Sequence, residues 1–510
     1  MESQTIVANL KATAQRYKDN EAIVYKDRRV TYSQLWFDVC RIADFLKQNG
    51  LQDGDRVTLV VENSPEFVAS YYAVLAAKGV VVALNTAAKH RDIANWLNHC
   101  GANWLIIDEK HGEFAQLHET FNDEINLLIV PKDSDSLNTV SSNNWREVNN
   151  SYTDSTIPLD IDPNKPAAII YTSGTTGTPK GVTLSHINLS SNVSSIVAYL
   201  GLVSDDRILN ILPFYYSYGN SVLHTHLAAG ATVILENSLT YPHVILEKIV
   251  AERATAFSGV PSTFTLLLRR VDFNNYDLSS LRYITQAGGP MTPHHIKQIT
   301  DFLPDASFFV MYGQTEATAR ISYLPPEQLF EKLGSVGIPI PGEEIEIRNN
   351  KNQAVKVNEK GEIYVSGDNV MLGYWRNEAL TSEVIVDGWL KTGDLAYKDE
   401  DGYVYITGRS SDMMKVGAHR ISPKEIEEVI SEIPAVSEVA VVGVPDPMLG
   451  ECIKAVVIPN LGVDLSKREI MAHCKKNLAI YKLPKLVVFT TELPKTASGK
   501  VRRFMLIDID

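Results

Sequence analysis

A run of small, hydroxyl-bearing and basic residues over 171–181 has the composition of a phosphate-binding loop. It reads Tyr-Thr-Ser-Gly-Thr-Thr-Gly-Thr-Pro-Lys-Gly and follows an apolar run over 167–170 that is typical of a buried strand. Its glycines let the backbone approach a ligand closely, and Lys180 adds a mobile positive charge. A Walker motif would end in Gly-Lys-Ser or Gly-Lys-Thr, and this loop does not. The segment therefore predicts polyphosphate binding by a loop other than the ordinary P-loop.

A second polar segment, over 312–316 (Tyr-Gly-Gln-Thr-Glu), directly follows the apolar run over 308–311. A single carboxylate at the carboxyl end of a strand can hold Mg²⁺ against phosphate oxygens, because this ion takes few protein ligands and keeps several of its waters. Gly313 allows the chain to turn at this point. Glu316 is therefore the candidate magnesium ligand.

Three further segments place polar groups on turns. Segment 287–290 (Ala-Gly-Gly-Pro) follows a predicted strand over 282–286, and segment 391–394 (Lys-Thr-Gly-Asp) offers a carboxylate suited to accept hydrogen bonds from both hydroxyl groups of a ribose. Near the C-terminus, segment 494–500 (Pro-Lys-Thr-Ala-Ser-Gly-Lys) ends in Lys500. A lysine there can offset negative charge that develops on phosphate oxygens.

The elements that must position these groups alternate between short apolar strands and helical patterns. The spacing predicts a strand over 56–61, a helix over 65–77 and a strand over 79–84. The same alternation returns at 231–235, 241–252, 262–271 and 308–312. It predicts an α/β architecture with largely parallel sheets. Residues 131–165, rich in Asp, Ser, Asn and Pro, predict a surface excursion before the phosphate loop.

A domain boundary is predicted near 408–412 (Gly-Arg-Ser-Ser-Asp). Beyond it the patterns predict two helices and three strands, at 423–432, 436–443, 452–458, 466–477 and 485–490. About 100 residues can form a small α+β core of their own. We therefore expect a large N-terminal domain over 1–409, built of parallel-rich sheets with helices, and a small mobile α+β domain over 410–510.

Bulk properties exclude several classes of function. The 510 residues, 45% apolar and 21% charged, are typical of a soluble protein of two or three domains. A net charge of −13 disfavours nucleic acid as a partner. No apolar run approaches the roughly 20 residues that span a bilayer, and the N-terminus lacks a signal pattern. The four scattered cysteines indicate reduced thiols rather than zinc ligands or disulfides. We expect a cytoplasmic enzyme.

Taken together, the motifs resemble the AMP-forming acyl-CoA synthetases in order and spacing, from about residue 8 to the C-terminus. That superfamily also contains the adenylation domains of peptide synthetases and firefly luciferase. The resemblance implies a two-step reaction in which an acid and ATP give an acyl-adenylate and pyrophosphate, and a thiol then takes the acyl group. It implies ATP and Mg²⁺, with CoA or a phosphopantetheine thiol as the acceptor.

The resemblance also implies a role for each motif. The aromatic ring of Tyr312 stacks on adenine, Thr315 meets the α-phosphate, and Glu316 binds magnesium. Asp394 and Arg409 reach the ribose hydroxyl groups. The whole implied nucleotide site comprises Thr172, Ser173, Gly174, Thr175, Thr176, Gly177, Lys180, Ala287, Gly288, Gly289, Tyr312, Gly313, Gln314, Thr315, Asp394, Arg409 and Lys500.

Two lysines divide the two steps between them in this resemblance. Lys500 drives adenylation, together with Thr176 and Glu316, and Lys415 lies in the loop that enters the active site for thioester formation. The family usually has Lys or Asp at the hinge between its domains, and Ser411 stands here instead. The hinge assignment is thereby left open.

The acid pocket is predicted within 212–221 (Leu-Pro-Phe-Tyr-Tyr-Ser-Tyr-Gly-Asn-Ser). The candidate pocket residues are Tyr216, Ser217, Asn220, Ser221 and Gly288. The Asp that pairs with an α-amino group in peptide-synthetase domains is absent near Ser217, which disfavours an ordinary α-amino acid but leaves an imino acid open. The aromatic density favours an apolar or aryl carboxylic acid, unless the tyrosines merely pack the sheet.

Several alternatives stay open at this point. The first is a carboxylate–CoA ligase, and the second is a stand-alone adenylation enzyme that loads an acid or amino or imino acid onto a separate carrier protein. A nucleotide sensor without chemistry is disfavoured because Glu316, Lys180 and Lys500 are all present. Nothing in the sequence is specific for the oxygen chemistry of a luciferase.

Overall fold

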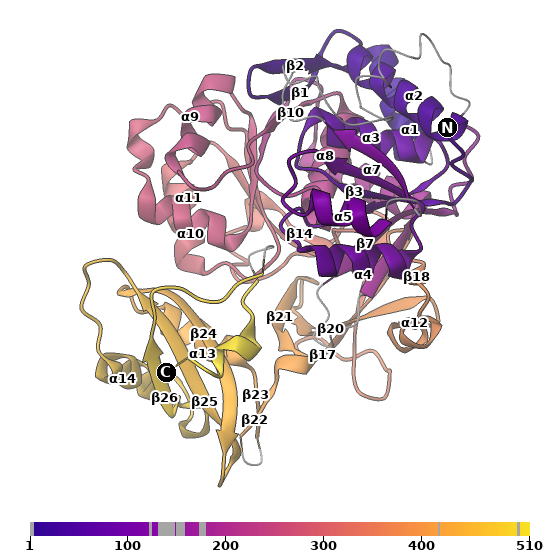
Figure 1. Cartoon of the computed structure of the whole chain (residues 1–510). Helices are drawn as coiled ribbons and strands as arrows, with labels where there is room; N and C mark the ends of the chain where they lie inside the picture. Colours follow the sequence, from indigo (N-terminus) through magenta and orange to yellow (C-terminus); the bar gives the residue numbers. More distant parts are fainter. Residues whose placement is uncertain are drawn as a thin grey trace.

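Four β-sheets organise the part of the chain that the structure describes (Figure 1). The structure, a computed structural model, describes residues 5–121, 125–130, 148, 159–172, 180–416, 419–496 and 500–509. Three sheets belong to the larger N-terminal part and the fourth to the C-terminal part. The predicted class is thereby confirmed: an α/β chain with a large N-terminal part and a small C-terminal one.

The first sheet, sheet A, has nine strands and ends at the predicted nucleotide site. Its five neighbouring pairs from β13 to β1 are all parallel, and only the edge strands β2, β14 and β15 run antiparallel. In spatial order the strands are β15 (Ile338–Pro339), β14 (Ser322–Leu324), β13 (Ser307–Tyr312), β12 (Tyr283–Gln286), β11 (Ala256–Gly259), β9 (Arg207–Asn210), β10 (Thr232–Leu235), β1 (Glu21–Tyr25) and β2 (Arg28–Thr31).

The second sheet, sheet B, has seven strands and carries the two ends of the predicted phosphate loop. Its neighbours from β7 to β6 pair in parallel, whereas β7, β8 and β18 pair antiparallel. In order the strands are β18 (Gly373–Tyr374), β8 (Lys180–Ser185), β7 (Pro166–Thr172), β4 (Val80–Ala83), β3 (Arg56–Val60), β5 (Trp104–Asp108) and β6 (Asn126–Val130). The alternating α/β pattern correctly predicted β3 and β4.

The third sheet, sheet C, is antiparallel throughout. It comprises β16 (Glu343–Arg348), β17 (Gly361–Gly367), β20 (Trp389–Lys398), β19 (Ile385–Val386) and β21 (Val404–Arg409). Sheet C brings the predicted ribose ligands of the chain next to sheet A and leads directly into the C-terminal part.

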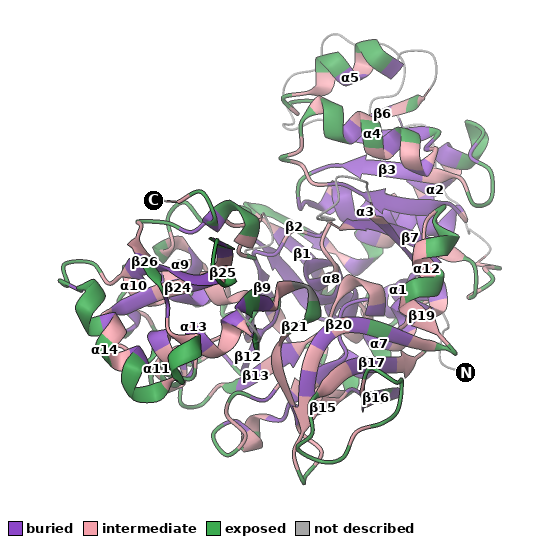
Figure 2. Cartoon of the chain, turned by 90° about the horizontal axis from the view of Figure 1, so that it is seen from below, coloured by how far each residue is buried: buried purple, intermediate pink, exposed green. Residues whose placement is uncertain are grey.

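Helices fill the space between sheets A and B and cover their outer faces. Helix α3 contacts β3 and β4 of sheet B, and α8 contacts β9 and β10 of sheet A. The two helices meet through buried side chains, with the Tyr71 hydroxyl donating to Asn220 Oδ1 at 3.3 Å and the Tyr72 hydroxyl 2.8 Å from His224 Nδ1. Both helices are buried along almost their whole length, and Figure 2 shows β3 buried while α5 and α14 present exposed faces.

The helices of the N-terminal part begin and end at recognisable caps. Ser64 caps α3 with a proline following it, Ser185 and Asn188 form a capping box on α7, and Gly201 ends α7 in the left-handed conformation. The helices are α1 (Ile6–Arg16), α2 (Tyr32–Gln48), α3 (Pro65–Ala76), α4 (His90–Cys100), α5 (Phe114–Phe121), α7 (His186–Leu200), α8 (Ser217–Ala229), α9 (His243–Glu252), α10 (Pro261–Arg270), α11 (Pro293–Phe302) and α12 (Glu378–Val384). Within the described ranges, none is long and apolar enough to cross a bilayer.

The C-terminal part has its own sheet, sheet D, and its own apolar core. Its elements are β22 (Met414–Val416), β23 (His419–Ile421), α13 (Pro423–Ser431), β24 (Val436–Asp446), β25 (Gly450–Pro459), α14 (Lys467–Asn477) and β26 (Leu486–Phe489). Each of the five elements predicted from the sequence is present within a few residues of its expected bounds. The domain boundary at 409/410 stays a prediction. The excursion predicted over 131–165 lies largely outside the described residues.

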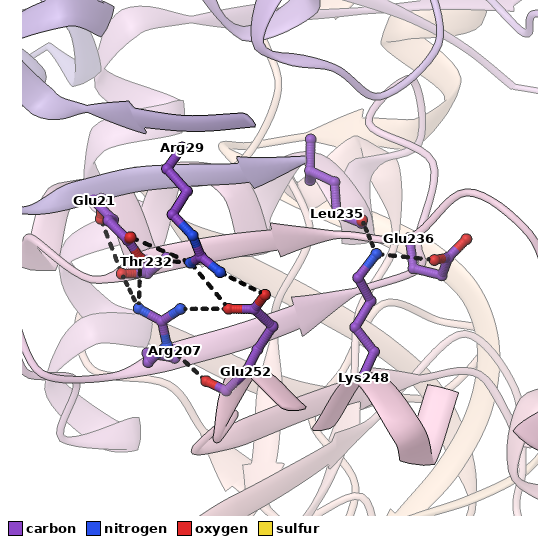
Figure 3. A network of polar contacts seen from close by, with 8 residues as sticks. All are labelled: Glu21, Arg29, Arg207, Thr232, Leu235, Glu236, Lys248 and Glu252. Atoms are coloured by element: carbon purple, nitrogen blue, oxygen red, sulfur yellow. Dashed lines mark hydrogen bonds and ion pairs between the residues drawn. The ribbon is translucent and has the colours of Figure 1, made fainter. Parts of the chain in front are cut away.

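A network of four charged side chains ties the N-terminal hairpin to sheet A and α9 (Figure 3). Arg207 of β9 and Arg29 of β2 both contact Glu21 of β1, at 2.9 and 3.2 Å, and both contact Glu252 of α9 at 2.9 Å. Burial alone would raise the pKa of Glu252, but its hydrogen bonds and ion pairs with both arginines lower it. Long-range pairing, not sequence proximity, thus places β1 and β2 on sheet A.

We predict that Glu252→Gln lowers the melting temperature by about 2 °C at neutral pH, because an ion-paired acceptor is lost. The lowered folded-state pKa means that this stabilisation is complete above the unfolded value of about 4.3 and is lost as pH falls through the folded value. Thermal unfolding across a pH series should show the gap between wild type and variant closing on acidification. Glu247→Gln, an exposed residue of the same helix, is the control and should leave the melting temperature unchanged.

Candidate active site

A buried carboxylate, Asp394, holds the centre of the predicted nucleotide site. Its Oδ2 accepts a hydrogen bond from the Tyr312 hydroxyl at 2.6 Å, and its Oδ1 lies 2.7 Å from Arg409 Nε. Tyr312 ends β13 of sheet A, whereas Asp394 and Arg409 are directly opposite each other in the β20–β21 register of sheet C. The antiparallel pairing therefore sets the ion pair, and the tyrosine joins it from another sheet.

The charges of this cluster support one another. Burial raises the pKa of Tyr312, and the neighbouring Asp394 raises it further, so the hydroxyl stays a donor. Desolvation lowers the pKa of Arg409, but its ion pair and hydrogen bond with Asp394 outweigh that effect and hold the pKa above its ordinary value. The guanidinium of Arg409 thus stays charged at neutral pH.

The segment that follows β13 makes a tight turn and presents Glu316. A Cβ atom on Gly313 would lie 1.8 Å from the Ala319 carbonyl oxygen, so only glycine fits where the two backbone stretches meet. Glu316, in the short 3₁₀ turn Thr315–Ala317, accepts a hydrogen bond from the Tyr374 hydroxyl at 2.9 Å. The Tyr374 ring also lies 5.9 Å from Lys180 Nζ. Tyr374 of β18 therefore joins the predicted magnesium ligand to the end of the predicted phosphate loop.

Lys500 reaches the same cluster from the C-terminal part. Desolvation lowers the pKa of its ammonium group, Arg409 lowers it further, and Asp394 and Glu316 oppose this by raising it. The residue stays solvent-exposed, yet these electrostatic neighbours all belong to the predicted nucleotide site. The Thr496 N–H donates to the Lys500 carbonyl at 2.7 Å, and the Lys500 N–H donates to Thr496 Oγ1 at 3.1 Å. The structure thus brings Lys500, Arg409, Asp394 and Glu316 together.

Lys415, the second predicted lysine, is not brought to this site. It is exposed on β22, where its backbone N–H donates to Glu451 Oε2 at 2.5 Å. Figure 1 shows β22 and β23 at the end of the C-terminal part that points away from the N-terminal part.

The predicted acid segment divides in two at the start of α8. The Ser217 hydroxyl lies 3.2 Å from the Thr315 hydroxyl, facing the turn that carries Glu316. Asn220 instead binds Tyr71 of α3, and the Ser221 hydroxyl donates to the Tyr218 carbonyl inside the helix. Of these candidates only Ser217 makes a contact toward the nucleotide site.

The remaining predicted pocket residues border this segment. Tyr216 is the N-cap residue of α8. Burial raises the pKa of its hydroxyl, and the charge of Arg502, from the C-terminal part, opposes this by lowering it. Gly288 has a φ of +90°, a conformation that favours glycine, and it follows the buried Ala287 at the end of β12. Gly289 accepts a hydrogen bond from Gln286 Nε2 at 2.7 Å.

Some predicted residues lie outside the described residues, or contribute only their backbone. Thr172 and Lys180 are register partners at the ends of β7 and β8 and mark the base of the phosphate loop. Gln314 precedes the 3₁₀ turn Thr315–Ala317. Ser411 lies in the short turn Ser410–Asp412, and its side chain is not described. The loop residues Ser173, Gly174, Thr175, Thr176 and Gly177 lie outside the described residues.

Sequence reasoning missed three side chains at or beside this site, and it named a fourth, Tyr218, only as part of the predicted acid segment. Tyr374 has no motif of its own and is found only through its contacts with Glu316 and Lys180. Arg502 follows the recognised lysine motif by two positions, and its proximity to Tyr216 depends on domain packing. Tyr218 and Arg320 pack on each other, with the guanidinium 4.2 Å from the ring centre. The signal that could have placed Tyr218 at the site is its position next to Ser217 in the same helix.

The donor set fits a magnesium ion that is held mainly by a nucleotide. Among the described residues, no group of three or more His, Cys, Asp or Glu side chains could hold a metal ion alone. Glu316 is a lone carboxylate close to Lys180 through Tyr374, at the base of the phosphate loop. Mg²⁺ bound by one carboxylate, phosphate oxygens and water needs no more protein ligands than this.

Comparison with protein families identifies similar sequences over nearly the whole chain. A family model described as AMP-binding enzyme matches residues 10–375, and one described as AMP-binding enzyme C-terminal domain matches 425–500. A long-chain-fatty-acid–CoA ligase of Bacillus subtilis (strain 168) is 32% identical over 99% of this chain and 94% of its own length. A feruloyl-CoA synthase of Amycolatopsis sp is 34% identical over 94% of each chain.

Solved structures agree with this similarity. An anthranilate CoA ligase in complex with anthranoyl-AMP is 27% identical, has a TM-score of 0.89, and is matched over 98% of this chain and 96% of that one. An o-succinylbenzoate CoA synthetase from Bacillus subtilis, in complex with ATP and magnesium ion, is 29% identical with a TM-score of 0.84 over 98% and 99% of the two chains.

We predict that Gly313→Ala removes most ATP-dependent activity and lowers the melting temperature, because the new methyl group would meet the Ala319 carbonyl oxygen at 1.8 Å. Backbone atoms cannot yield as a flexible side chain would, so the turn that carries Glu316 must shift. Gly112→Ala is the matched control, since nothing lies within 4 Å of the Cβ position there. ATP–pyrophosphate exchange and thermal unfolding measure both effects. Equal behaviour of the two variants would contradict the close approach.

Proposed function

We propose a reaction for this chain, which belongs to the AMP-binding enzyme family: it activates a carboxylic acid with ATP and passes the acyl group to CoA. The chain is an adenylate-forming acid–thiol ligase. In the first step the acid's carboxylate oxygen attacks the α-phosphorus, and the bond to the bridging oxygen of pyrophosphate breaks. In the second step the thiol sulfur attacks the acyl carbon, the acyl-adenylate releases AMP, and a thioester forms.

The convergence of Lys500 with Arg409, Asp394 and Glu316 is the observation that carries the first step. Attack of a carboxylate on a phosphate brings two anions together and moves charge onto the departing pyrophosphate. A positioned ammonium group at that point contributes about 3 kcal/mol of transition-state stabilisation in comparable sites. Asp394 and Glu316 oppose the effects that lower the pKa of Lys500, and thereby favour its charged form.

The Asp394 cluster is proposed to hold the nucleoside. Its carboxylate would accept hydrogen bonds from the ribose hydroxyl groups, and Arg409, already bound to that carboxylate, would reach the same hydroxyl groups. The Tyr312 hydroxyl anchors its ring through Asp394, which leaves the ring face for adenine. The proposed nucleoside site also includes Thr315, Ala287, Gly288, Gly289 and Gln314. The loop from Thr172 to Lys180 is proposed to hold the phosphates.

Magnesium enters the reaction with ATP, and Glu316 is the residue proposed to hold it. When bound, the ion supplies positive charge to the phosphate oxygens. The Tyr374 hydroxyl fixes the carboxylate from one side and leaves the other oxygen free to face the nucleotide. Thr176, in the phosphate loop, is proposed to assist at the same phosphates.

The second step needs a different arrangement of the C-terminal part. Lys415 is the residue proposed to serve thioester formation, and it lies away from the site in this structure. We propose that the domain of 410–510 rotates on the domain of 1–409, with the turn at Ser411 as the hinge. The rotation would exchange Lys500 for Lys415 beside one acyl-adenylate.

The acid is proposed to be apolar or aromatic, bound beside Ser217 and Tyr216. The similarity to a fatty-acid ligase and to a feruloyl-CoA synthase is nearly equal, so the names of relatives do not decide its identity. Both of these relatives are named for the use of CoA, which favours CoA over a carrier protein as the acceptor. The net charge of −13 supports the proposed absence of nucleic-acid partners, and a cytoplasmic location stays a prediction.

The function is tested by ATP–pyrophosphate exchange over a panel of fatty, aryl and amino acids, followed by mass detection of the thioester with CoA. Exchange with an acid and formation of its acyl-CoA are the expected results. Exchange without formation of acyl-CoA would indicate that a carrier protein, and not CoA, is the acceptor. Release of ADP instead of AMP would contradict formation of an acyl-adenylate.

We predict that Lys500→Ala lowers adenylate formation by at least about a hundredfold but leaves thiolation of supplied acyl-AMP largely intact. Lys415→Ala should do the reverse, because the two lysines serve different half-reactions. Lys475→Ala, an exposed lysine of α14, is the control for both. Single-turnover assays of each step measure the split. Equal loss of both steps in either variant would contradict the division of roles.

We predict that Glu316→Gln raises the Mg²⁺ concentration needed for half-maximal exchange, since a neutral amide is a weaker ligand for a hard cation. A magnesium titration at saturating ATP measures the shift. Glu327→Gln, a carboxylate outside this site, provides the comparison and should leave the titration unchanged. An unchanged magnesium requirement in Glu316→Gln would remove this residue as the ligand.

A further inference from the structure

One arginine beside the active site, Arg320, is buried and has no carboxylate partner. The residue is only 3% exposed, and no acidic side chain of the described residues forms an ion pair with it. Its Nε donates to Met311 Sδ at 3.2 Å, and its guanidinium lies over the Tyr218 ring. Burial raises the pKa of the neighbouring Tyr199 to about 12, and Arg320 opposes this through its charge and a hydrogen bond to that neutral hydroxyl. A buried charge normally has an opposite charge beside it, because its lost hydration must be offset.

The contacts that Arg320 does make offset only part of that loss. A cation–π contact with tyrosine and a hydrogen bond to a thioether are both weaker than an ion pair. Two other partly buried arginines of the N-terminal part do have such a partner: Arg207 pairs with Glu21 and Glu252, and Arg282 pairs with Asp206 at 2.6 Å. Arg320 therefore lacks a counter-charge that the fold supplies elsewhere.

The backbone around Arg320 is held firmly. Its carbonyl oxygen accepts hydrogen bonds from two buried amides, Asn192 Nδ2 at 3.0 Å and Asn369 Nδ2 at 2.8 Å. Thr318 has a φ of +64°, which is strained for a β-branched residue, and its hydroxyl donates to the Asn369 carbonyl at 2.6 Å. The charge is thus fixed in place by the fold instead of escaping to solvent.

Arg320 lies close to the residues that are proposed to border the acid. A Cβ on Gly313 would lie 2.9 Å from the Arg320 Cα, so the arginine flanks the turn that presents Thr315 and Glu316. Tyr218, under its guanidinium, follows Ser217, whose hydroxyl faces Thr315. The charge therefore lies one side chain away from the residue that is proposed to border the acid.

Tyr218, which lies between the Arg320 guanidinium and Ser217, is itself part of a chain of hydrogen-bonded side chains. The Tyr218 hydroxyl lies 2.8 Å from Thr285 Oγ1, which in turn lies 2.7 Å from Ser258 Oγ. Ser258 and Thr285 lie near the carboxyl ends of the parallel strands β11 and β12. Ligands of parallel sheets bind at this edge. A lining of this kind suits an acid that carries a second polar group.

We propose that Arg320 is a specificity-determining residue, and that the acid carries a second carboxylate, on an apolar or aromatic body, which pairs with this guanidinium in the bound state. The inference rests on the proposed function and refines its acid. The reacting carboxylate would lie toward Thr315 and the second one toward Arg320, with Tyr218 contacting the body between them.

The test compares dicarboxylic acids with monocarboxylic acids of matched length and shape, in ATP–pyrophosphate exchange with the wild-type enzyme. Straight-chain diacids are paired with their monoacids, and benzene dicarboxylic acids with benzoic acids. We expect at least one diacid to exceed its matched monoacid about tenfold or more in kcat/KM, because a site built for a polar group rejects an analogue that lacks it. Wild-type data alone decide this, so folding of a variant is not required.

Variants then assign the preference to the arginine. Arg320→Met should lower the ratio of diacid to monoacid kcat/KM at least about tenfold, and Arg320→Lys should restore part of it because the charge returns. Arg282→Met is the matched control: that arginine also contacts a tyrosine ring, at 4.9 Å, but it is paired with Asp206, and the ratio should not change.

The outcomes separate this inference from the function beneath it. If no acid of either kind supports exchange, the proposed function fails. If monoacids support exchange as well as every matched diacid, the function stands and the second carboxylate is wrong. A diacid preference that survives in Arg320→Met would contradict the role of this residue.

Discussion

Asp394 is buried and ion-paired, and the fold has to bring its partners to it from separate elements. Tyr312 comes from the end of sheet A, and Arg409 comes from the neighbouring strand of sheet C. Removing a charge from water costs several kcal/mol unless it is paired and hydrogen-bonded. The carboxylate therefore acts as a joint between the two sheets, and the polar groups of the active site are arranged around it.

The Asp394–Arg409 pair also lies next to the contacts that join the C-terminal part to sheet C. The β21 strand that carries Arg409 also accepts hydrogen bonds from the start of α13: Ser422 Oγ donates to the Thr407 carbonyl at 2.6 Å, and Lys424 Nζ donates to the Ile406 carbonyl. These contacts hold the small part in the position that brings Lys500 toward Asp394. Polar contacts of this kind suit the rotation that is proposed to exchange Lys500 for Lys415.

Local patterns predicted part of the fold, including β3, α3, β4 and the five elements of the C-terminal part, because the apolar period of each is visible in the sequence. They did not predict that β1 and β2 join sheet A, because that pairing is made over about two hundred residues of chain. Nor did they identify Tyr374 or Arg320, which carry no motif and become significant only through partners brought by the fold. The sequence also did not indicate that Asn220, a predicted pocket residue, accepts a hydrogen bond from Tyr71 between two helices.

The acyl-adenylate is the central claim, and transfer of an isotope tests it most directly. An acid that supports exchange is prepared with ¹⁸O in its carboxyl group and turned over with ATP and CoA, and the products are analysed by mass spectrometry. If the carboxylate attacks the α-phosphorus, one labelled oxygen appears in AMP when the thiol releases it. Label in inorganic phosphate, with unlabelled AMP or with ADP as the product, would show attack at another phosphorus and contradict the account.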